Sequence, residues 1–232
     1  MIDYYKIYQT QADQYDALVG YEDHQGHLLP ALTKIRSLEA ISAVELGAGT
    51  GRFTRLLAPY AAHIVAIDIS MHMLEVAKCR LTSDGSKNNS LVQADHRSLP
   101  IADGQADVAI AGWSFGHLIG WHPDNWHHQI ELAVSEMGRI LRVGGTAIIL
   151  ETLGTGQRNP APPTAGLAQY YAYLEKERGF SKKWIRTDYQ FPSVAEAENL
   201  TSFFFGQELA SRVAEENSPL VPECTGIWWK KF

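Results

Sequence analysis

The chain has 232 residues, of which 45% are hydrophobic, and a formal net charge of −6 at pH 7. This length and hydrophobic content suffice for one substantial core, so we expect one domain rather than two independent ones. The acidic balance argues against binding along a nucleic-acid backbone, which requires clustered Lys and Arg, and favours a small-molecule partner.

The N-terminus and the cysteines bear on the environment of the protein. The first residues include the early acid Asp3 and no apolar stretch of signal-peptide length, and no later segment approaches about 18 continuous apolar residues. Cys79 and Cys224 are too few for a disulfide framework or a thiolate metal site. We therefore expect a cytoplasmic protein without a membrane span, and the sequence leaves its oligomeric state open.

In chain order, residues 1–27 are expected to form a helical N-terminal cap. Strand-like and helix-like patterns then alternate between residues 41 and 152, which is typical of an open, doubly wound α/β sheet. The apolar runs are short and rich in Val and Ile, as strands covered on both faces should be. They are Ala43–Leu46, His63–Ile69, Ser90–Ala94, Val108–Gly112 and Thr146–Leu150.

The clearest helix follows Pro123 and Asp124, and we expect it to end at Gly144 and Gly145. After the fifth strand, a linker-like stretch introduces a helix capped by Thr164. We interpret residues 154–183 as an inserted helical lid.

Residues 184–232 complete the predicted domain. Trp184–Phe191 alternates like a strand, Ser193 begins a capping box, and Cys224–Phe232 has the pattern of a last strand. This segment is expected to hold a C-terminal hairpin with additional helices.

The most informative segment is the connection after the first predicted strand. Gly47, Gly49 and Gly51 follow that strand directly, and a helix pattern begins at Arg52. Strand-end glycines let a ligand approach the backbone, and the helix N-terminus offers free N–H groups. A dinucleotide fingerprint requires glycine where Arg52 stands, and Glu45 before the loop would repel a phosphate. The loop therefore favours a cofactor with a cationic end.

Glu45 and the three glycines match E/D-x-G-x-G-x-G, the first motif of the class I S-adenosylmethionine-dependent methyltransferases, and the chain resembles this family. The resemblance implies S-adenosyl-L-methionine as cofactor and a Rossmann-like sheet of seven strands, mostly parallel with an antiparallel C-terminal strand. It covers about residues 28–232, with 28–152 as the cofactor-binding core. In the family pattern L-x-P-G-G before the fifth strand, Val143 replaces the usual Pro.

Further motifs of the family follow in the expected order. Asp68 ends the second strand, where a carboxylate can accept hydrogen bonds from both ribose hydroxyls, a device that nicotinamide enzymes share. The resemblance implies that Asp95 receives the adenine amino group, that the backbone N–H of His96 meets the adenine ring, and that Gly112 borders the methyl donor. Ile69 would offer adenine an apolar face. The expected cofactor contacts are thus Glu45, Gly47, Gly49, Gly51, Asp68, Ile69, Asp95, His96 and Gly112.

The acceptor atom can be oxygen, nitrogen or carbon. A hydroxyl or an acidic carbon benefits from a proton acceptor poised near neutrality, which is the natural role of His. His117 follows the central strand and is the candidate catalytic residue, although no orienting acid is identifiable beside it. Trp113 and Tyr170 are expected to line the substrate pocket, while aromatic stripes at helical spacing are more often core. The histidines between positions 117 and 128 match no familiar ligand set, so we expect no metal.

Other functions stay open at this point. A nicotinamide-dependent oxidoreductase would share the strand, the loop and the ribose acid, but Arg52 and Asp95 count against it. A non-catalytic S-adenosylmethionine-binding protein would use the same cofactor residues. An RNA methyltransferase is disfavoured because the lysine pairs of the chain are isolated.

Overall fold

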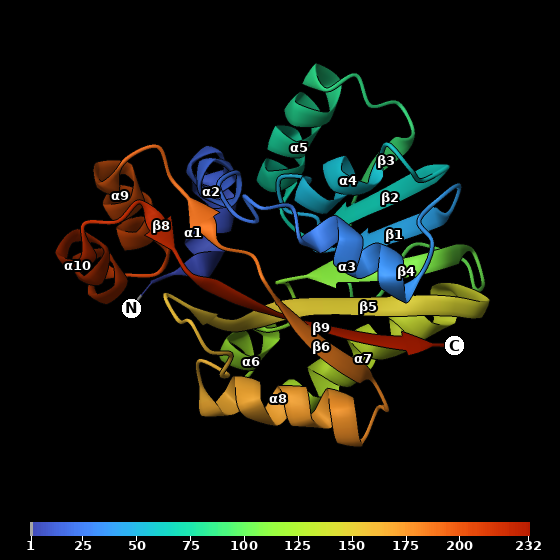
Figure 1. The fold of residues 1–232 in the computed structure, drawn as a ribbon. Helices are drawn as coiled ribbons and strands as arrows, with labels where there is room; N and C mark the ends of the chain where they lie inside the picture. Colours follow the sequence, from blue (N-terminus) through green and yellow to red (C-terminus); the bar gives the residue numbers. More distant parts are fainter. Residues whose placement is uncertain (1) are drawn as a thin grey trace.

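The computed structural model describes residues 2–232, and at its centre lies an open sheet with helices on both faces (Figure 1). The strands are β1 (Ser42–Leu46), β2 (His63–Asp68), β3 (Asn89–Gln93), β4 (Ala106–Gly112), β5 (Leu141–Thr155), β6 (Ser181–Arg186), β7 (Tyr189–Gln190), β8 (Leu220–Val221) and β9 (Glu223–Lys231). The helices are α1 (Tyr4–Thr10), α2 (Ala12–Val19), α3 (Leu28–Ile35), α4 (Arg52–Leu57), α5 (Met71–Ser83), α6 (His117–Trp121), α7 (Trp126–Ile140), α8 (Ala165–Lys176), α9 (Val194–Phe204) and α10 (Gln207–Glu216).

The large sheet has seven strands in the order β3-β2-β1-β4-β5-β9-β6, and β7 pairs with β8 in a separate two-stranded sheet. The pairs from β3 to β5 are parallel, whereas β9 runs antiparallel to both β5 and β6. This confirms the predicted Rossmann-like, doubly wound sheet with a reversed strand near the C-terminus. The strand order reverses between β1 and β4, and ligands of open α/β sheets bind at the carboxyl ends of the strands at such a point.

Both faces of the sheet are covered, which explains why its strands are continuous apolar runs. Along β5, Ile148 and Leu150 pack into one core together with α3 and α4. Ala147 and Ile149 point to the opposite face and pack with α7 and α8. The alternation follows from the two-residue period of a strand.

Two predicted boundaries are wrong. The helix before β5 ends at Ile140 rather than at the glycine pair, because Leu141 is already extended and pairs with Ala106 of β4. Gly144, with φ of +80°, lies inside an irregular first part of β5.

The predicted strand Trp184–Phe191 is divided in two. β6 starts at Ser181 and ends at Arg186, and only Tyr189 and Gln190 continue as β7. Between them, the Thr187 hydroxyl bonds Glu22 and Thr225 in the interior, so the chain leaves the sheet there.

Helix α8 forms where the sequence predicts it, and the Thr164 hydroxyl accepts the Leu167 N–H at its start. It covers the same side of the sheet as α6 and α7 (Figure 1), with Tyr171 and Leu174 buried in the core that it shares with α7. Within the segment 154–183, expected as a lid, α8 therefore covers the sheet with its aromatic stripe in the core, and the two ends of the segment belong to β5 and β6.

The expected N-terminal cap contains α1 and α2; only its residue 1 falls outside the described residues. In Figure 1 these two helices lie between the sheet and the pair α9 and α10. They approach the carboxyl edge of the sheet, where the predicted site lies.

Candidate functional site

The glycine loop joins β1 to α4 at the carboxyl edge of the sheet. Its glycines have positive φ angles, +74° at Gly47, +53° at Gly49 and +83° at Gly51. The N–H groups of Gly47 and Ala48 both donate to the Ile67 carbonyl, 2.8 Å away, which fixes the loop to the end of β2. A Cβ at Gly47 would collide with the Ser114 side chain, so glycine is what lets the loops after β1 and β4 meet.

Asp68 lies beside this loop. The Gly49 N–H donates to Oδ2 and the Ser70 N–H to Oδ1, each across 2.8 Å. Burial raises the pKa of Asp68, and these N–H groups offset only part of the rise. A carboxylate can accept more than two hydrogen bonds, so Asp68 retains capacity for ligand hydroxyls. The adjacent Ile69 side chain is 50% exposed, which leaves an apolar surface next to the acid.

A second acid, Asp95, follows the end of β3, and its carboxylate forms an ion pair with Arg97. Arg97 pairs with Asp95 through Nε to Oδ1 at 2.9 Å and Nη2 to Oδ2 at 2.5 Å. Burial favours a higher pKa for Asp95, but the bonds from Arg97 outweigh it and lower the pKa. An adenine amino group would therefore share Asp95 with Arg97.

His96 turns its ring inward, 4.9 Å from the Phe115 ring. Burial lowers its pKa to about 4, so the ring is neutral at pH 7. Its buried Nε2 has no hydrogen-bond partner within residues 2–232.

The Glu45 side chain points toward α4. Its carboxyl accepts a hydrogen bond from the Thr54 hydroxyl, and burial raises its pKa to about 8. The group is therefore mostly protonated at pH 7. A cationic ligand nearby would lower that pKa and so favour the ionised carboxylate.

The end of β4 is shaped by aromatic packing. A Cβ at Gly112 would collide with the Phe53 ring, so glycine lets α4 press against this strand. Trp113 has φ of +49°, stacks on Phe53 at 5.7 Å and lies 4.7 Å below the Arg52 guanidinium. Arg52 also pairs with Glu22 of the N-terminal cap at 2.5 Å. Trp113 thus packs on the start of α4, next to the arginine that pairs with the cap.

His117 begins α6 and lies in an aromatic cluster. Its Nε2 is 2.8 Å from the Tyr8 hydroxyl, and its ring stacks on Trp121 at 5.1 Å. Burial, assisted by the nearby His96, lowers the pKa of His117 to about 4. That value lies well below the neutrality expected of a proton acceptor, and the ring is neutral at pH 7.

Helices α1, α2 and α9 cover this region. Tyr4, Tyr8 and Tyr15 all contact the Phe204 ring, at centroid distances of 5.1 to 6.4 Å. A Cβ on Gly49 would lie 3.7 Å from the Tyr15 ring, so the cap reaches the glycine loop itself. The aromatic rings that cover this region therefore come from α1, α2 and α9.

Glu151 is a residue that sequence reasoning missed. It is 3% exposed near the end of β5, and its Oε1 accepts the Gly116 N–H at 2.8 Å, one residue before His117. Burial raises its pKa to about 8. The available signal was an acid directly after the apolar run of the fifth strand.

Tyr170, expected in the substrate pocket, is completely buried in the core against Tyr171. Its hydroxyl has no hydrogen-bond partner within residues 2–232. The side chain therefore does not line an open surface, and it lies beside the Glu151 carboxyl.

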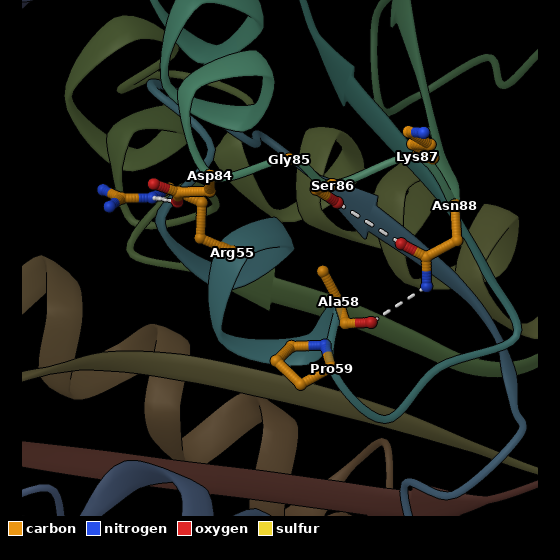
Figure 2. Close-up of a pocket in the computed structure, with 8 residues that line it drawn as sticks. All are labelled: Arg55, Ala58, Pro59, Asp84, Gly85, Ser86, Lys87 and Asn88. Atoms are coloured by element: carbon orange, nitrogen blue, oxygen red, sulfur yellow. Dashed lines mark hydrogen bonds and ion pairs between the residues drawn. The ribbon is translucent and has the colours of Figure 1, made fainter.

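A hollow lies at the opposite, amino edge of the sheet, where the α5–β3 loop meets the end of α4 (Figure 2). Its polar groups bond one another: Arg55 pairs with Asp84 at 2.6 Å, and the Asn88 amide donates to the Ala58 carbonyl at 2.9 Å. These bonds hold the loop to the end of α4, and none of the sequence motifs lies there.

The residues at the glycine loop fit S-adenosylmethionine. Asp68 is held at the end of β2 with capacity for hydroxyls, and Ile69 is exposed beside it. Arg52 Nη2 and His96 Nε2 are buried polar atoms without a protein partner in residues 2–232, as expected around a ligand space. Within the same residues, no cluster of three or more His, Cys, Asp or Glu could hold a metal ion.

A glycine loop and a strand-end acid at the switch point of this sheet define a cofactor-binding α/β protein of the methyltransferase type. Residues 44–149 match the methyltransferase domain family. This match and the fold support a class I S-adenosylmethionine-dependent methyltransferase.

Three similar proteins illustrate the range of this fold. The demethylmenaquinone methyltransferase of Lactococcus lactis is 26% identical over 153 residues, which cover 63% of this chain and 57% of that relative. A SAM-dependent methyltransferase from Aquifex aeolicus has a TM-score of 0.59 at 12% identity, covering 95% of this chain and 97% of its own. The [4+2]-cyclase SpnF has a TM-score of 0.59 at 18% identity, covering 88% of this chain and 80% of its own.

No helix among residues 2–232 combines the length and apolarity that crossing a membrane would require.

Proposed function

We propose that this chain binds S-adenosylmethionine across the glycine loop and transfers its methyl group to an uncharged small molecule. The observation that carries the proposal is the contact between the Gly49 N–H and the Asp68 carboxylate at the switch point. It keeps an acid with free lone pairs next to a loop that a ligand can approach closely.

In this proposal Asp68 accepts the ribose hydroxyls, and Ile69 covers one face of adenine. Asp95 and the His96 N–H contact the adenine edge, with Arg97 sharing the Asp95 carboxylate. Glu45, the three loop glycines and Gly112 surround the methionine end. Trp113 is the wall toward the acceptor.

S-adenosylmethionine, when bound, supplies an electrophilic methyl group. The chain contributes alignment and exclusion of water, because α1, α2 and α9 cover the carboxyl edge with aromatic rings. His117 is neutral and keeps a lone pair on one ring nitrogen. We propose that this lone pair accepts a hydrogen bond from the acceptor and orients it, because burial makes the ring too weak a base to hold the acceptor's proton at pH 7.

The surroundings of His117 support an uncharged, flat acceptor. Tyr4, Tyr8 and Trp121 pack around it, and burial holds the Tyr8 phenol un-ionised by raising its pKa. The nearby Arg52 charge is already paired with Glu22. Demethylmenaquinone, named in the relative from Lactococcus lactis, is therefore one candidate acceptor to assay.

We further propose a cytoplasmic protein that acts without nucleic acid.

The test is calorimetric titration of the full chain with S-adenosylmethionine, S-adenosylhomocysteine and NADH in parallel. Asp68→Ala should weaken binding of both adenosyl ligands about ten- to a hundredfold or more, because hydrogen bonds to a charged acceptor are lost, at about 1.5–3 kcal/mol. Asp84→Ala, at the other edge of the sheet, is the matched control and should bind like the wild type.

NADH binding alone would overturn the proposal in favour of an oxidoreductase. Adenosyl binding that Asp68→Ala leaves unchanged would remove the ribose role of Asp68. Tight adenosyl binding without S-adenosylhomocysteine formation, across an acceptor screen that includes demethylmenaquinone, would favour the non-catalytic alternative.

A further inference from the structure

We propose that Tyr8 of α1 is a positioning residue for His117: its hydroxyl oxygen accepts the Nε2–H of the imidazole, so that Nδ1 keeps the ring's lone pair for the methyl acceptor. The inference rests on the proposed methyl transfer. It adds the orienting group that the sequence does not reveal, and it comes from the cap rather than from the cofactor-binding core.

The geometry around the imidazole leaves little freedom. Tyr8 Oη lies 2.8 Å from His117 Nε2, and within residues 2–232 it is the ring's hydrogen-bond partner. Trp121 stacks on one side of the ring at 5.1 Å with an interplanar angle of 18°. Tyr4 approaches at 5.3 Å. Packing therefore sets the plane of the ring, and the bond to Tyr8 sets which nitrogen points into the cap.

Tyr8 is also tied to the cofactor side of the site. Its backbone carbonyl accepts the Ser70 hydroxyl at 2.8 Å. The N–H of the same Ser70 donates to Asp68, also at 2.8 Å. A continuous chain of bonds thus runs from the proposed ribose acid through Ser70 and Tyr8 to His117. The orientation of the imidazole therefore depends on the packing of α1 against the start of α5.

Tyr4 provides the contrast that separates orientation from packing. It lies on the same helix, and its ring contacts both His117 and Phe204. Within residues 2–232 its hydroxyl forms no bond to the imidazole, whereas that of Tyr8 does. Removing either hydroxyl leaves the ring packing in place, so only Tyr8→Phe should release the imidazole.

The test is nitrogen-15 NMR of the histidine rings in the full chain without ligand. His117→Asn assigns the His117 signals. The wild type should show His117 as the neutral Nε2–H tautomer, and Tyr8→Phe should shift it to a mixture of both; a wild-type Nδ1–H tautomer would overturn the proposal. Tyr4→Phe should keep the wild-type pattern. With an active acceptor, Tyr8→Phe should lower kcat about three- to tenfold, the effect of one hydrogen bond, while the affinity for S-adenosylmethionine stays within twofold.

An unchanged His117 spectrum in Tyr8→Phe would overturn the proposal, as would the same change in Tyr4→Phe. If Tyr8→Phe proves unstable, Ser70→Ala tests the same chain, because it frees the Tyr8 backbone and should also broaden the tautomer distribution; retention of the single tautomer there would count against it. The NMR result needs no cofactor, so its failure is distinct from failure of the calorimetric test of methyl-donor binding.

Discussion

Single residues at the carboxyl edge decide how closely the loops of the site approach one another. Trp113 is a bulky residue with φ of +49°, a conformation that costs about 1–3 kcal/mol and persists only when its surroundings enforce it. Here Phe53 stacks on its ring and Arg52 lies above it. The strained residue follows the end of β4, where we propose that the methyl donor binds, and its packing would fix a wall of that proposed site.

The same reasoning gives a prediction for Gly47. Gly47→Ala should lower the free energy of unfolding by more than the roughly 1–2 kcal/mol that a left-handed conformation costs an L-residue, because its Cβ would also collide with Ser114. Gly85→Ala is the matched control, since Gly85 has φ of +70° but a Cβ there would meet no atom within 4 Å. Chemical denaturation of both variants measures the difference, and equal losses would show that the loops can separate without cost.

At the scale of elements, the N-terminal cap depends on other parts of the chain. Helices α1 and α2 have 7 and 8 residues, too short to be stable alone in water. Asp16 pairs with Arg80 of α5 at 2.6 Å, and Glu22 pairs with Arg52 of α4 at 2.5 Å. The cap is therefore held to both helices that flank β2, and its aromatic residues fill the space against α9.

Phe204 should be the main packing contact of the cap. Phe204→Ala is expected to speed hydrogen exchange in α1 and α2 at least tenfold while leaving β1, β4 and β5 protected, because its ring contacts Tyr4, Tyr8 and Tyr15. The neighbouring Phe203, whose ring contact is with Phe204, provides the control variant Phe203→Ala. Equal exchange in the two variants would assign the cap's stability to its ion pairs instead.

At the scale of the whole molecule, buried acids link stability to pH. Burial raises the pKa of Glu45 and of Glu151 to about 8, and it raises the pKa of Glu223 as well. Between pH 4.5 and 8 the unfolded chain releases these protons and the folded chain keeps them, so stability falls as pH rises through this window. The buried His96 and His117 act in the opposite sense below about pH 6.5, because their pKa values are lowered to about 4.

Glu151→Gln tests this linkage. The amide keeps an oxygen to accept the Gly116 N–H but cannot ionise. The variant should gain stability relative to the wild type as pH rises from about 5 to about 8, by more than about 1.4 kcal/mol, the free energy of one pKa unit. Denaturation at both pH values measures the gain, with the exposed Glu39→Gln as control. A difference independent of pH would mean that Glu151 ionises normally in the fold.

Some features could be predicted from the sequence because they are local. The glycine loop, Asp68 at the end of β2 and the apolar strands each depend on spacings of a few residues, which reflect backbone sterics and the two-residue period of buried strands. Their order along the chain then indicated the parallel sheet and its class. The same local signals failed where one pattern is compatible with two kinds of structure. A glycine pair is typical of a helix end, but Gly144 and Gly145 lie within β5.

Only the tertiary structure decided how the site is completed. Tyr8 and His117 are 109 positions apart, and no local pattern relates them. The capture of Asp95 by Arg97, the Glu151 carboxyl beneath Gly116 and the burial of Tyr170 likewise depend on which elements pack together. The sequence by itself determined the fold class and the cofactor loop through short-range backbone and periodicity rules. The acceptor side was decided by packing between distant segments, because pKa values, ring orientation and burial are properties of the assembled neighbourhood.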